Sequence, residues 1–256
     1  MNKLLLPPEP ATEPNPLNSR RSFLRYTGAG VAVTGLLLAG CDDDSDGTGT
    51  GTDTTLIDVG PTGPQDLGVL NYAYALEQLG AAFYAQVRTG TYYTGLATTS
   101  AEKQILDDVA SHERAHVDFF RTVLGTNAIK ALEPDFGAIN FNDRNSVLTN
   151  ARDFADLGVA AYNGSGRFIQ VPVNLVLAGK IVSVEARHAG LIRDLLTYNS
   201  FVGADVVDLF TPASATSAPG DGNGTGKEKS KTPTQVLETA NKFLKTGSRL
   251  SANNLK

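Results

Sequence analysis

Two short motifs in this sequence place a glutamate three residues before a histidine. They are "ERAH", which joins Glu113 to His116, and "EARH", which joins Glu185 to His188. Residues three apart on an α-helix lie on the same side, so each pair can direct a carboxylate and an imidazole to one point. The chain has 3 histidines, and two of them complete such a pair. Carboxylate oxygens and imidazole nitrogens together suit iron, manganese or zinc.

A further carboxylate, Glu77, lies within the apolar segment "NYAYALEQLGAAFY". Three carboxylates that face one core would repel one another, and each isolated buried charge costs several kcal/mol. A pair of divalent metal ions would compensate these charges. The sequence therefore predicts a metal site with the ligands Glu77, Glu113, His116, Glu185 and His188.

The helices that must present these residues are predicted from hydrophobic periodicity. The expected spans are residues 65–88, 100–124, 144–163 and 172–198, with a shorter helix at 232–245. Gly125 suits the end of the second span, and Pro172 suits the first turn of the fourth.

The same periodicity predicts which side chains are buried. The buried face of the second helix is expected to hold Ile105, Val109, Glu113, His116, Phe120 and Val123. That of the third is expected to hold Leu148, Ala151, Ala155, Gly158, Val159 and Tyr162. That of the fourth is expected to hold Val173, Leu177, Ile181, Val184, Glu185, His188, Ile192 and Leu195. Tyr74, Tyr84 and Tyr162 are interpreted as packing residues, and His112 as structural or exposed, because it lies about 100° around the helix from Glu113.

Composition narrows the class of protein. The chain has 256 residues, 41% of them hydrophobic, which is enough for a core. One cysteine excludes a disulfide within the chain and a thiolate metal cluster. The net charge is −5, and residues 41–256 alone hold 18 basic and 25 acidic side chains. An acidic body without a basic patch argues against nucleic acid as a partner.

The N-terminal segment has the layout of an export signal. "SRRSFLR" contains Arg20 and Arg21 and precedes an uncharged run that ends at Cys41. This run is too short for a comfortable membrane span. The arginine pair resembles the twin-arginine signal, and "LAGC" resembles the lipobox of bacterial lipoproteins. The resemblance implies a lipid on Cys41, and hence a membrane anchor facing the periplasm or the cell surface.

The chain is accordingly divided into five parts. They are a twin-arginine lipoprotein signal (1–41), a flexible acidic Gly/Thr tether (42–64), a helical bundle (65–200), a mobile loop (201–232) and a short helix with the C-terminal tail (233–256). The tether and loop are rich in small and polar residues that cannot bury enough surface to fold.

The order of the motifs resembles the bacterial ferritin-like domain family, whose members include desiccation-related proteins. "NYAYALEQLGAAFY", "HERAH", "ADLGVAAY" and "EARH" carry the resemblance, which covers residues 66–200. It implies an all-α fold: a ferritin-like four-helix bundle with a long crossover and a short extra C-terminal helix. It also implies that Glu77 is a terminal ligand, that Glu113 and Glu185 are able to bridge two ions, and that His116 and His188 each bind one.

The chain departs from this family in the third helix. Where members tend to have a glutamate followed by an aspartate, this sequence has Ala155 and Asp156. Asp156 lies about 100° around the helix from the core-facing position, so it substitutes poorly for the missing carboxylate. Three alternatives follow: two ions with water or an exogenous carboxylate in that place, one ion, or a buried hydrogen-bonded network without metal.

Two classes of function remain. The first is an exported, lipid-anchored metalloprotein that binds one or two Fe or Mn ions and oxidises ferrous iron or removes peroxide or dioxygen. The second is a non-catalytic envelope stress protein with a degenerate metal site. The expected partner is a membrane, through Cys41; a homo-oligomer is compatible with the sequence, whereas a large storage cage does not suit a tethered chain.

Overall fold

The computed structural model describes residues 56–60, 65–214, 216 and 222–255. The predicted signal over residues 1–41, with Cys41, lies outside the described residues, as does most of the predicted tether. Within the described residues, no helix has the length and apolar character needed to cross a bilayer.

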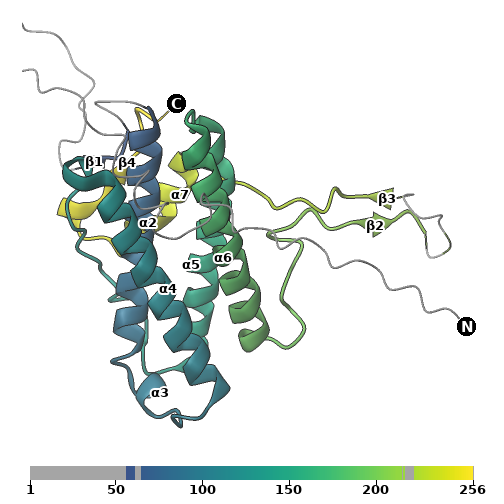
Figure 1. The fold of residues 1–256 in the computed structure, drawn as a ribbon. Coiled ribbons are helices and arrows are strands. Elements are labelled where there is room, and N and C mark those ends of the chain that lie inside the picture. Colours follow the sequence, from purple (N-terminus) through teal and green to yellow (C-terminus); the bar gives the residue numbers. More distant parts are fainter. Residues whose placement is uncertain (1–55, 61–64, 215, 217–221, 256) are drawn as a thin grey trace, which may run out of the picture. The chain divides into compact units, whose positions relative to one another are not determined.

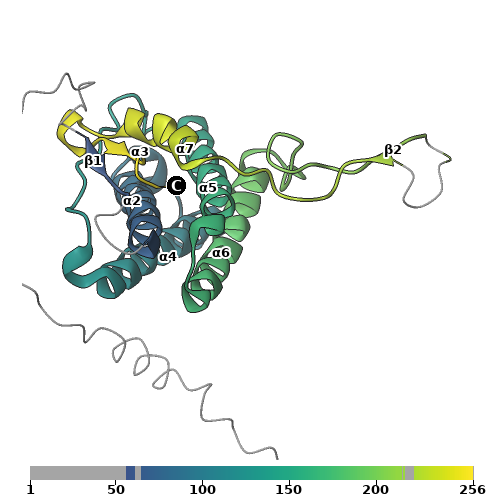
Figure 2. The ribbon, with the colours of Figure 1, turned by 90° about the horizontal axis from the view of Figure 1, so that it is seen from above.

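Four long helices form a bundle (Figure 1). They are α2 (Gln65–Val87), α4 (Ala101–Leu124), α5 (Arg144–Ser165) and α6 (Pro172–Leu196). Helix α2 packs mainly on α4, and α5 on α6, as the view from above shows (Figure 2). The predicted all-α four-helix bundle is confirmed, and each predicted helix is present with closely similar bounds.

Local sequence signals set the ends of these helices. The Ser100 side chain accepts a hydrogen bond from the Lys103 backbone N–H at the start of α4, and Asp143 does the same for Ser146 at the start of α5. Such caps satisfy backbone donors that the first turn leaves free. Gly125 ends α4 with φ 55°, a conformation that favours glycine.

The connections contain short helices. A four-residue helix α3 (Thr91–Thr94) lies between α2 and α4, and a 3-10 turn η2 (Gly125–Asn127) opens the long crossover to α5. The Asn71 side chain of α2 holds the crossover, since it accepts from the Ile129 N–H at 2.8 Å and donates to the Asn127 carbonyl at 2.9 Å. A second 3-10 turn, η3 (Gly166–Phe168), joins α5 to α6.

The C-terminal segment covers the side of α2 that faces away from the metal-site residues. It comprises α7 (Pro233–Ala240), η4 (Asn241–Phe243), η5 (Thr246–Ser248) and β4 (Leu250–Ser251), which pairs in parallel with β1 (Ile57–Asp58). Val236 and Leu237 of α7 join one apolar cluster with Tyr72 and Leu79 of α2. Because both sides of α2 are covered, this helix is buried nearly all round.

The segment expected to be a loop over residues 201–232 contains a short antiparallel strand pair. Strand β2 (Thr211–Pro212) pairs with β3 (Gly222–Asn223), and Val207 forms an isolated bridge with Glu228. The Lys231 N–H donates to the Ala160 carbonyl of α5 at 3.1 Å, which connects the end of this segment to the bundle.

Two of the predicted buried faces require correction. In α4 the buried apolar residues are Leu106, Val109, Val117, Phe120 and Leu124. Ile105, His116 and Val123 are only partly buried, so the face is rotated by roughly half the 100° that separates successive residues. The periodicity was ambiguous here, because Ile105–Leu106 and Val123–Leu124 each offer two adjacent apolar side chains.

The first turns of α6 were also predicted wrongly. Val173 is 54% exposed, and its neighbours Leu175 and Val176 are 48% and 56% exposed. The buried face of α6 begins only at Ile181. The periodicity continued through this segment, but burial also depends on which neighbouring elements reach it.

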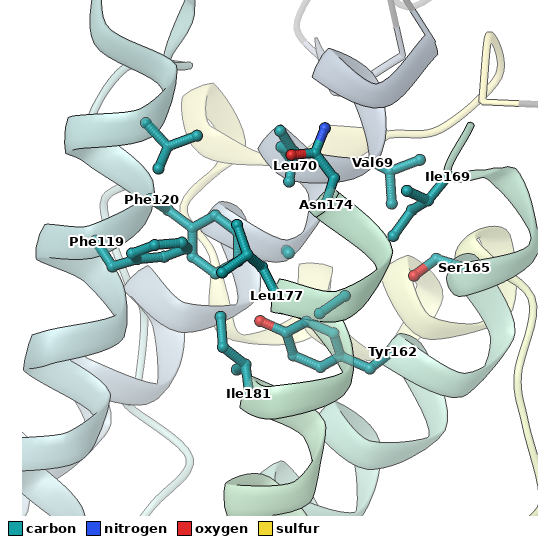
Figure 3. Close-up of a pocket in the computed structure, with 13 residues that line it drawn as sticks. Val69, Leu70, Phe119, Phe120, Tyr162, Ser165, Ile169, Asn174, Leu177 and Ile181 are labelled. Atoms are coloured by element: carbon teal, nitrogen blue, oxygen red, sulfur yellow. The ribbon is translucent and has the colours of Figure 1, made fainter. Parts of the chain in front are cut away.

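An apolar pocket lies between the four long helices (Figure 3). Leu70 of α2, Phe120 of α4, Tyr162 of α5 and Leu177 of α6 line it. Tyr162 also lines the neighbouring cavity that contains the polar site described next.

Candidate metal centre

The structure brings the five predicted ligands together in the bundle interior. Glu77 comes from α2, Glu113 and His116 from α4, and Glu185 and His188 from α6. Glu77, Glu113, Glu185 and His188 are 3%, 7%, 4% and 4% exposed, and His116 is partly buried. Carboxylates this deeply buried require compensation by cations or protons.

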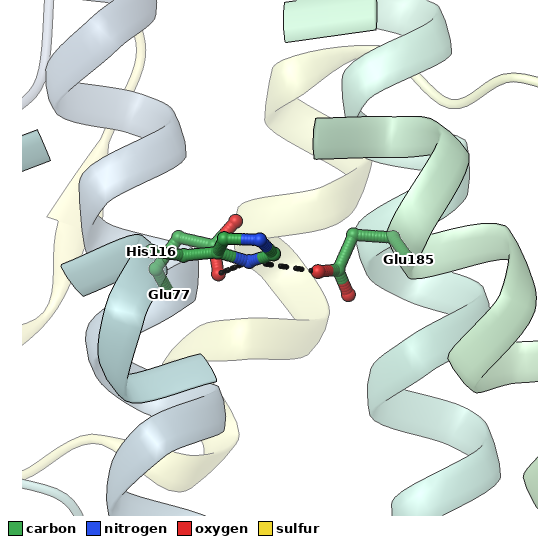
Figure 4. Close-up of side chains that lie close together, drawn as sticks. All are labelled: Glu77, His116 and Glu185. Carbon is green, nitrogen blue, oxygen red and sulfur yellow. Dashed lines mark hydrogen bonds and ion pairs between the residues drawn. The ribbon is translucent and has the colours of Figure 1, made fainter. Parts of the chain in front are cut away.

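One cluster joins Glu77, His116 and Glu185 (Figure 4). His116 Nδ1 lies 3.1 Å from Glu77 Oε2 and 3.0 Å from Glu185 Oε1. The imidazole of α4 is thus held between carboxylates from α2 and α6. Glu77 Oε1 also accepts a hydrogen bond from the Tyr162 hydroxyl of α5 at 2.5 Å.

A second cluster joins Glu113, Glu185 and His188. His188 Nδ1 lies 3.4 Å from Glu113 Oε1 and 3.5 Å from Glu185 Oε2. Glu185 therefore belongs to both clusters, one oxygen facing each imidazole, which suits a carboxylate shared by two ions. The family resemblance implied the same for Glu113, but the described geometry places Glu113 in the second cluster only.

The ligand atoms fit a bound metal ion. In each cluster, one oxygen or nitrogen from every residue lies within 4.8 Å of the others. Glu185 Oε1 and His188 Nδ1 are buried and form no hydrogen bond of good geometry among the described residues. Their nearest polar neighbours are the charged groups of the same clusters, and both atoms belong to expected ligands. Three carboxylates and two imidazoles are a donor set for iron or manganese.

The backbone of α2 is shaped to admit the Glu113 carboxylate. A Cβ atom at Gly80 would clash with Glu113 Oε2. Gly80 follows Glu77 by three residues and therefore lies on the same face of α2. The absence of a side chain at this position allows the carboxylate of α4 to approach the helix.

The three buried carboxylates titrate differently. Burial and the nearby charge of Glu185 raise the pKa of Glu113 to about 8. Burial likewise raises the pKa of Glu77, although His116 opposes this effect. Burial also disfavours the charged form of Glu185, but contacts with His116 and His188 outweigh it and lower its pKa to about 2.

Both imidazoles favour the protonated form in the absence of metal. Burial lowers the pKa of His116, but contacts with Glu185 and Glu77 outweigh it and raise the pKa to about 10. In the same way, Glu113 and Glu185 overcome burial and raise the pKa of His188 to about 9. Protons thus compensate the carboxylates when no metal is bound, and a metal ion must displace them.

Helix α5 brings no carboxylate to this centre. Ala155 is buried and lines the cavity beside Glu185. Asp156 instead accepts hydrogen bonds from Arg193 of α6, the shortest at 2.7 Å, and Arg193 also binds Asp205. Asp156 therefore joins α5 to α6 and takes no part in the ligand clusters, as its position around the helix predicted.

Three residues of the site were not predicted to belong to it. Tyr162 was interpreted as packing but donates to Glu77, and Tyr84 lines the same cavity. His112 is exposed, as predicted, yet its Nδ1 lies 3.0 Å from His188 Nε2. The signal for Tyr162 is its position two turns after Ala155; for His112 it is the four-residue spacing to His116.

Comparison with known families agrees with this geometry. Residues 65–198 match the ferritin-like domain family, and the match covers more than half of the chain. The fold and the sequence thus define the class: the protein belongs to the ferritin-like domain family. A search of curated proteins found no match to this chain.

Proposed function

We propose that this protein binds one or two transition-metal ions, iron or manganese, in the bundle core and uses them in redox chemistry. The observation that carries the proposal is the pair of buried clusters that share Glu185. Each cluster sets carboxylate oxygens and an imidazole nitrogen within 4.8 Å of one another in the bundle interior, a spacing that a single metal ion can fill.

The proposed reaction is oxidation of ferrous iron coupled to removal of peroxide or dioxygen: ferrous iron gives up the electrons, and peroxide or dioxygen accepts them together with protons. Bound iron or manganese would supply the electron transfer. The chain supplies the carboxylates that stabilise the added positive charge and the imidazoles that release protons as metal binds. Tyr162 orients Glu77 through its 2.5 Å hydrogen bond.

The test is the metal content of a double variant, His116→Ala with His188→Ala. It is expected to lose stoichiometric metal and, with it, ferrous oxidation and peroxide consumption. The matched control replaces Arg114 and Arg187, which are exposed on the same two helices, with alanine. Unchanged metal content in the histidine variant would overturn the proposal.

A second candidate is a non-catalytic envelope stress protein of the desiccation-related type. It is favoured by the ion pairs that His116 and His188 already form with Glu77, Glu113 and Glu185. These ion pairs can compensate the buried carboxylate charges in the absence of metal. This candidate predicts metal-free protein of full thermal stability, whereas the metalloprotein is expected to lose melting temperature on chelation.

We also propose export by the twin-arginine route and lipid attachment at Cys41, with the body held at the cell envelope. The support is the arginine pair at Arg20 and Arg21 before an uncharged run that ends in "LAGC". Cys41→Ser is expected to shift the protein from the membrane to the soluble fraction, and Arg20→Lys with Arg21→Lys to block export. Membrane retention of the Cys41 variant would contradict the anchor.

A further inference from the structure

A small cavity lies beside the candidate metal centre, on the side of α5. Ala155 and Gly158 line it together with Gly80, Glu113 and Glu185. The space open to the centre of a water molecule is about 30 Å³. One water needs roughly 10–15 Å³ on this measure, so the cavity has room for a molecule of a few heavy atoms.

The small residues of α5 create this space. Ala155 ends at Cβ, and Gly158 has no side chain; a Cβ added there would still lie 3.9 Å from Glu185 Oε2. Most of the other lining side chains are apolar, whereas Glu77, Glu113, Glu185 and two tyrosine hydroxyls give the cavity its polar groups. A ligand here would contact the carboxylate clusters directly.

Tyr84 offers an unused hydrogen-bond donor in this cavity. The residue is 3% exposed, and its hydroxyl has no hydrogen-bond partner among the described residues. Leaving a buried hydroxyl without a partner is unfavourable, so an acceptor bound beside it is favoured. Tyr162, the second tyrosine of the cavity, already donates to Glu77.

Charge balance indicates what the acceptor is. Glu77, Glu113 and Glu185 are the carboxylates of the two clusters. Two divalent ions would leave an excess of one positive charge over these three carboxylates, and a buried excess charge is unfavourable. A monoanion would neutralise it. With a single ion bound, the excess is negative, and an anion would be repelled.

We infer that the cavity beside Ala155 binds a small carboxylate, such as formate or acetate, which completes the ligand set of a second metal ion. This inference rests on the proposed function. A carboxylate has two oxygens, so it can accept from Tyr84 with one and remain free to bind an ion with the other. The bound carboxylate would come from solution and would take the place of the side-chain carboxylate that α5 lacks at Ala155.

The test is a titration of the metal-free full chain with manganese(II), and anaerobically with ferrous iron, in the presence and absence of acetate. We expect acetate to leave the affinity for the first ion unchanged and to raise the affinity for the second at least tenfold. Formate should act in the same way. Pivalate, which has the same charge but a tert-butyl group too bulky for the cavity, is the control and should have no effect.

Variants of the cavity residues test whether acetate acts in the cavity beside Ala155. Ala155→Leu fills the cavity and should abolish the response to acetate while the first ion still binds. Ala155→Glu should bind the second ion without acetate. Tyr84→Phe should weaken the acetate effect roughly fivefold, which corresponds to one lost hydrogen bond. Tyr72→Phe is its control, because this buried tyrosine of α2 also lacks a partner among the described residues but does not line the cavity.

Each outcome is informative. Equal affinity for metal with and without acetate, an equal effect of pivalate, or an equal effect of the two tyrosine variants would overturn this inference and leave the proposed function standing. The comparison of acetate with pivalate needs no variant, so it remains decisive even if a substitution prevents folding. If neither manganese(II) nor ferrous iron binds under any condition, the proposed function itself is overturned.

Discussion

At the candidate metal centre, protons and metal ions compete for the same side-chain atoms. Glu113, His116 and His188 all have pKa values raised by burial or by their partners, to about 8, 10 and 9. Glu185 stays ionised because both imidazoles contact it. The same contacts that stabilise the metal-free core therefore hold protons on atoms that a metal ion would use.

The first prediction concerns pH. Metal binding must release the protons held by Glu113, His188 and His116, whose pKa values are about 8, 9 and 10. Apparent metal affinity should thus rise as pH increases from 6 towards 9, with more protons released per ion at the lower pH. Calorimetry in buffers of different ionisation enthalpy measures both quantities. Affinity that does not vary with pH would contradict these protonation states.

The second prediction concerns Gly80. Gly80→Ala should displace the Glu113 carboxylate and lower metal affinity at least tenfold, with little loss of stability because only the end of a flexible side chain must move. Gly179→Ala on α6 is the matched control, since a Cβ there meets nothing within 4 Å. The control should bind metal normally and gain roughly 0.4–1 kcal/mol. Chemical denaturation and a metal titration would measure both changes, and equal behaviour of the two variants would contradict the close approach.

At the scale of elements, α5 and α6 are joined by a largely buried ion pair, in which Asp156 follows the cavity-lining Ala155. The Arg193 and Asp156 side chains are 8% and 15% exposed, whereas that of Asp205 is 66% exposed. Burial raises the pKa of Asp156 despite its contact with Arg193, whereas the hydrogen bonds from Arg193 to Asp156 raise the pKa of Arg193 above its ordinary value. This pair joins α5 to α6.

The third prediction follows from this difference in burial. Asp156→Ala leaves Arg193 buried with one exposed partner and should lower the free energy of unfolding by about 3 kcal/mol. Asp205→Ala should cost less than about 1 kcal/mol. Both variants should retain their metal, because neither residue is in a ligand cluster. Urea denaturation separates the two, and loss of metal in Asp156→Ala at full stability would place this residue in the site.

Much of the element scale was predictable from sequence. Caps such as Ser100 and the 3.6-residue periodicity located the long helices, and the two Glu-x-x-His motifs located four of the residues in the buried clusters. The buried face of α4 and the exposure of Val173 were not predictable, because they depend on which other elements reach these helices. The contacts of Tyr84 and Tyr162 were missed for a related reason: an aromatic residue on a buried face gives no signal for what its hydroxyl meets.

At the scale of the whole described molecule, α2 connects the candidate metal centre to the C-terminal segment. One side of α2 presents Glu77, and the other packs under α7 and near the β1–β4 pair. Residues from both ends of the described chain thus bury the helix that carries a ligand. The parallel pairing of β1 with β4 links segments far apart in sequence, and no local pattern predicts it.

The fourth prediction tests the packing of α7 against α2. Leu237 of α7 is 3% exposed, and Leu237→Ala should lower the free energy of unfolding by about 2–5 kcal/mol. Because Leu237 does not contact the clusters, metal stoichiometry in the folded protein should not change. Denaturant unfolding together with elemental analysis would measure both. A normal stability would mean that α7 does not form part of the core.

The most direct test of the central claim is anomalous X-ray diffraction from crystals of the full chain grown with manganese(II) or ferrous iron. We expect an anomalous peak among Glu77, His116 and Glu185, or among Glu113, Glu185 and His188, with both positions occupied when acetate is supplied. Crystals that diffract well but show no peak between these residues, or a peak only elsewhere, would contradict a metal centre in this bundle.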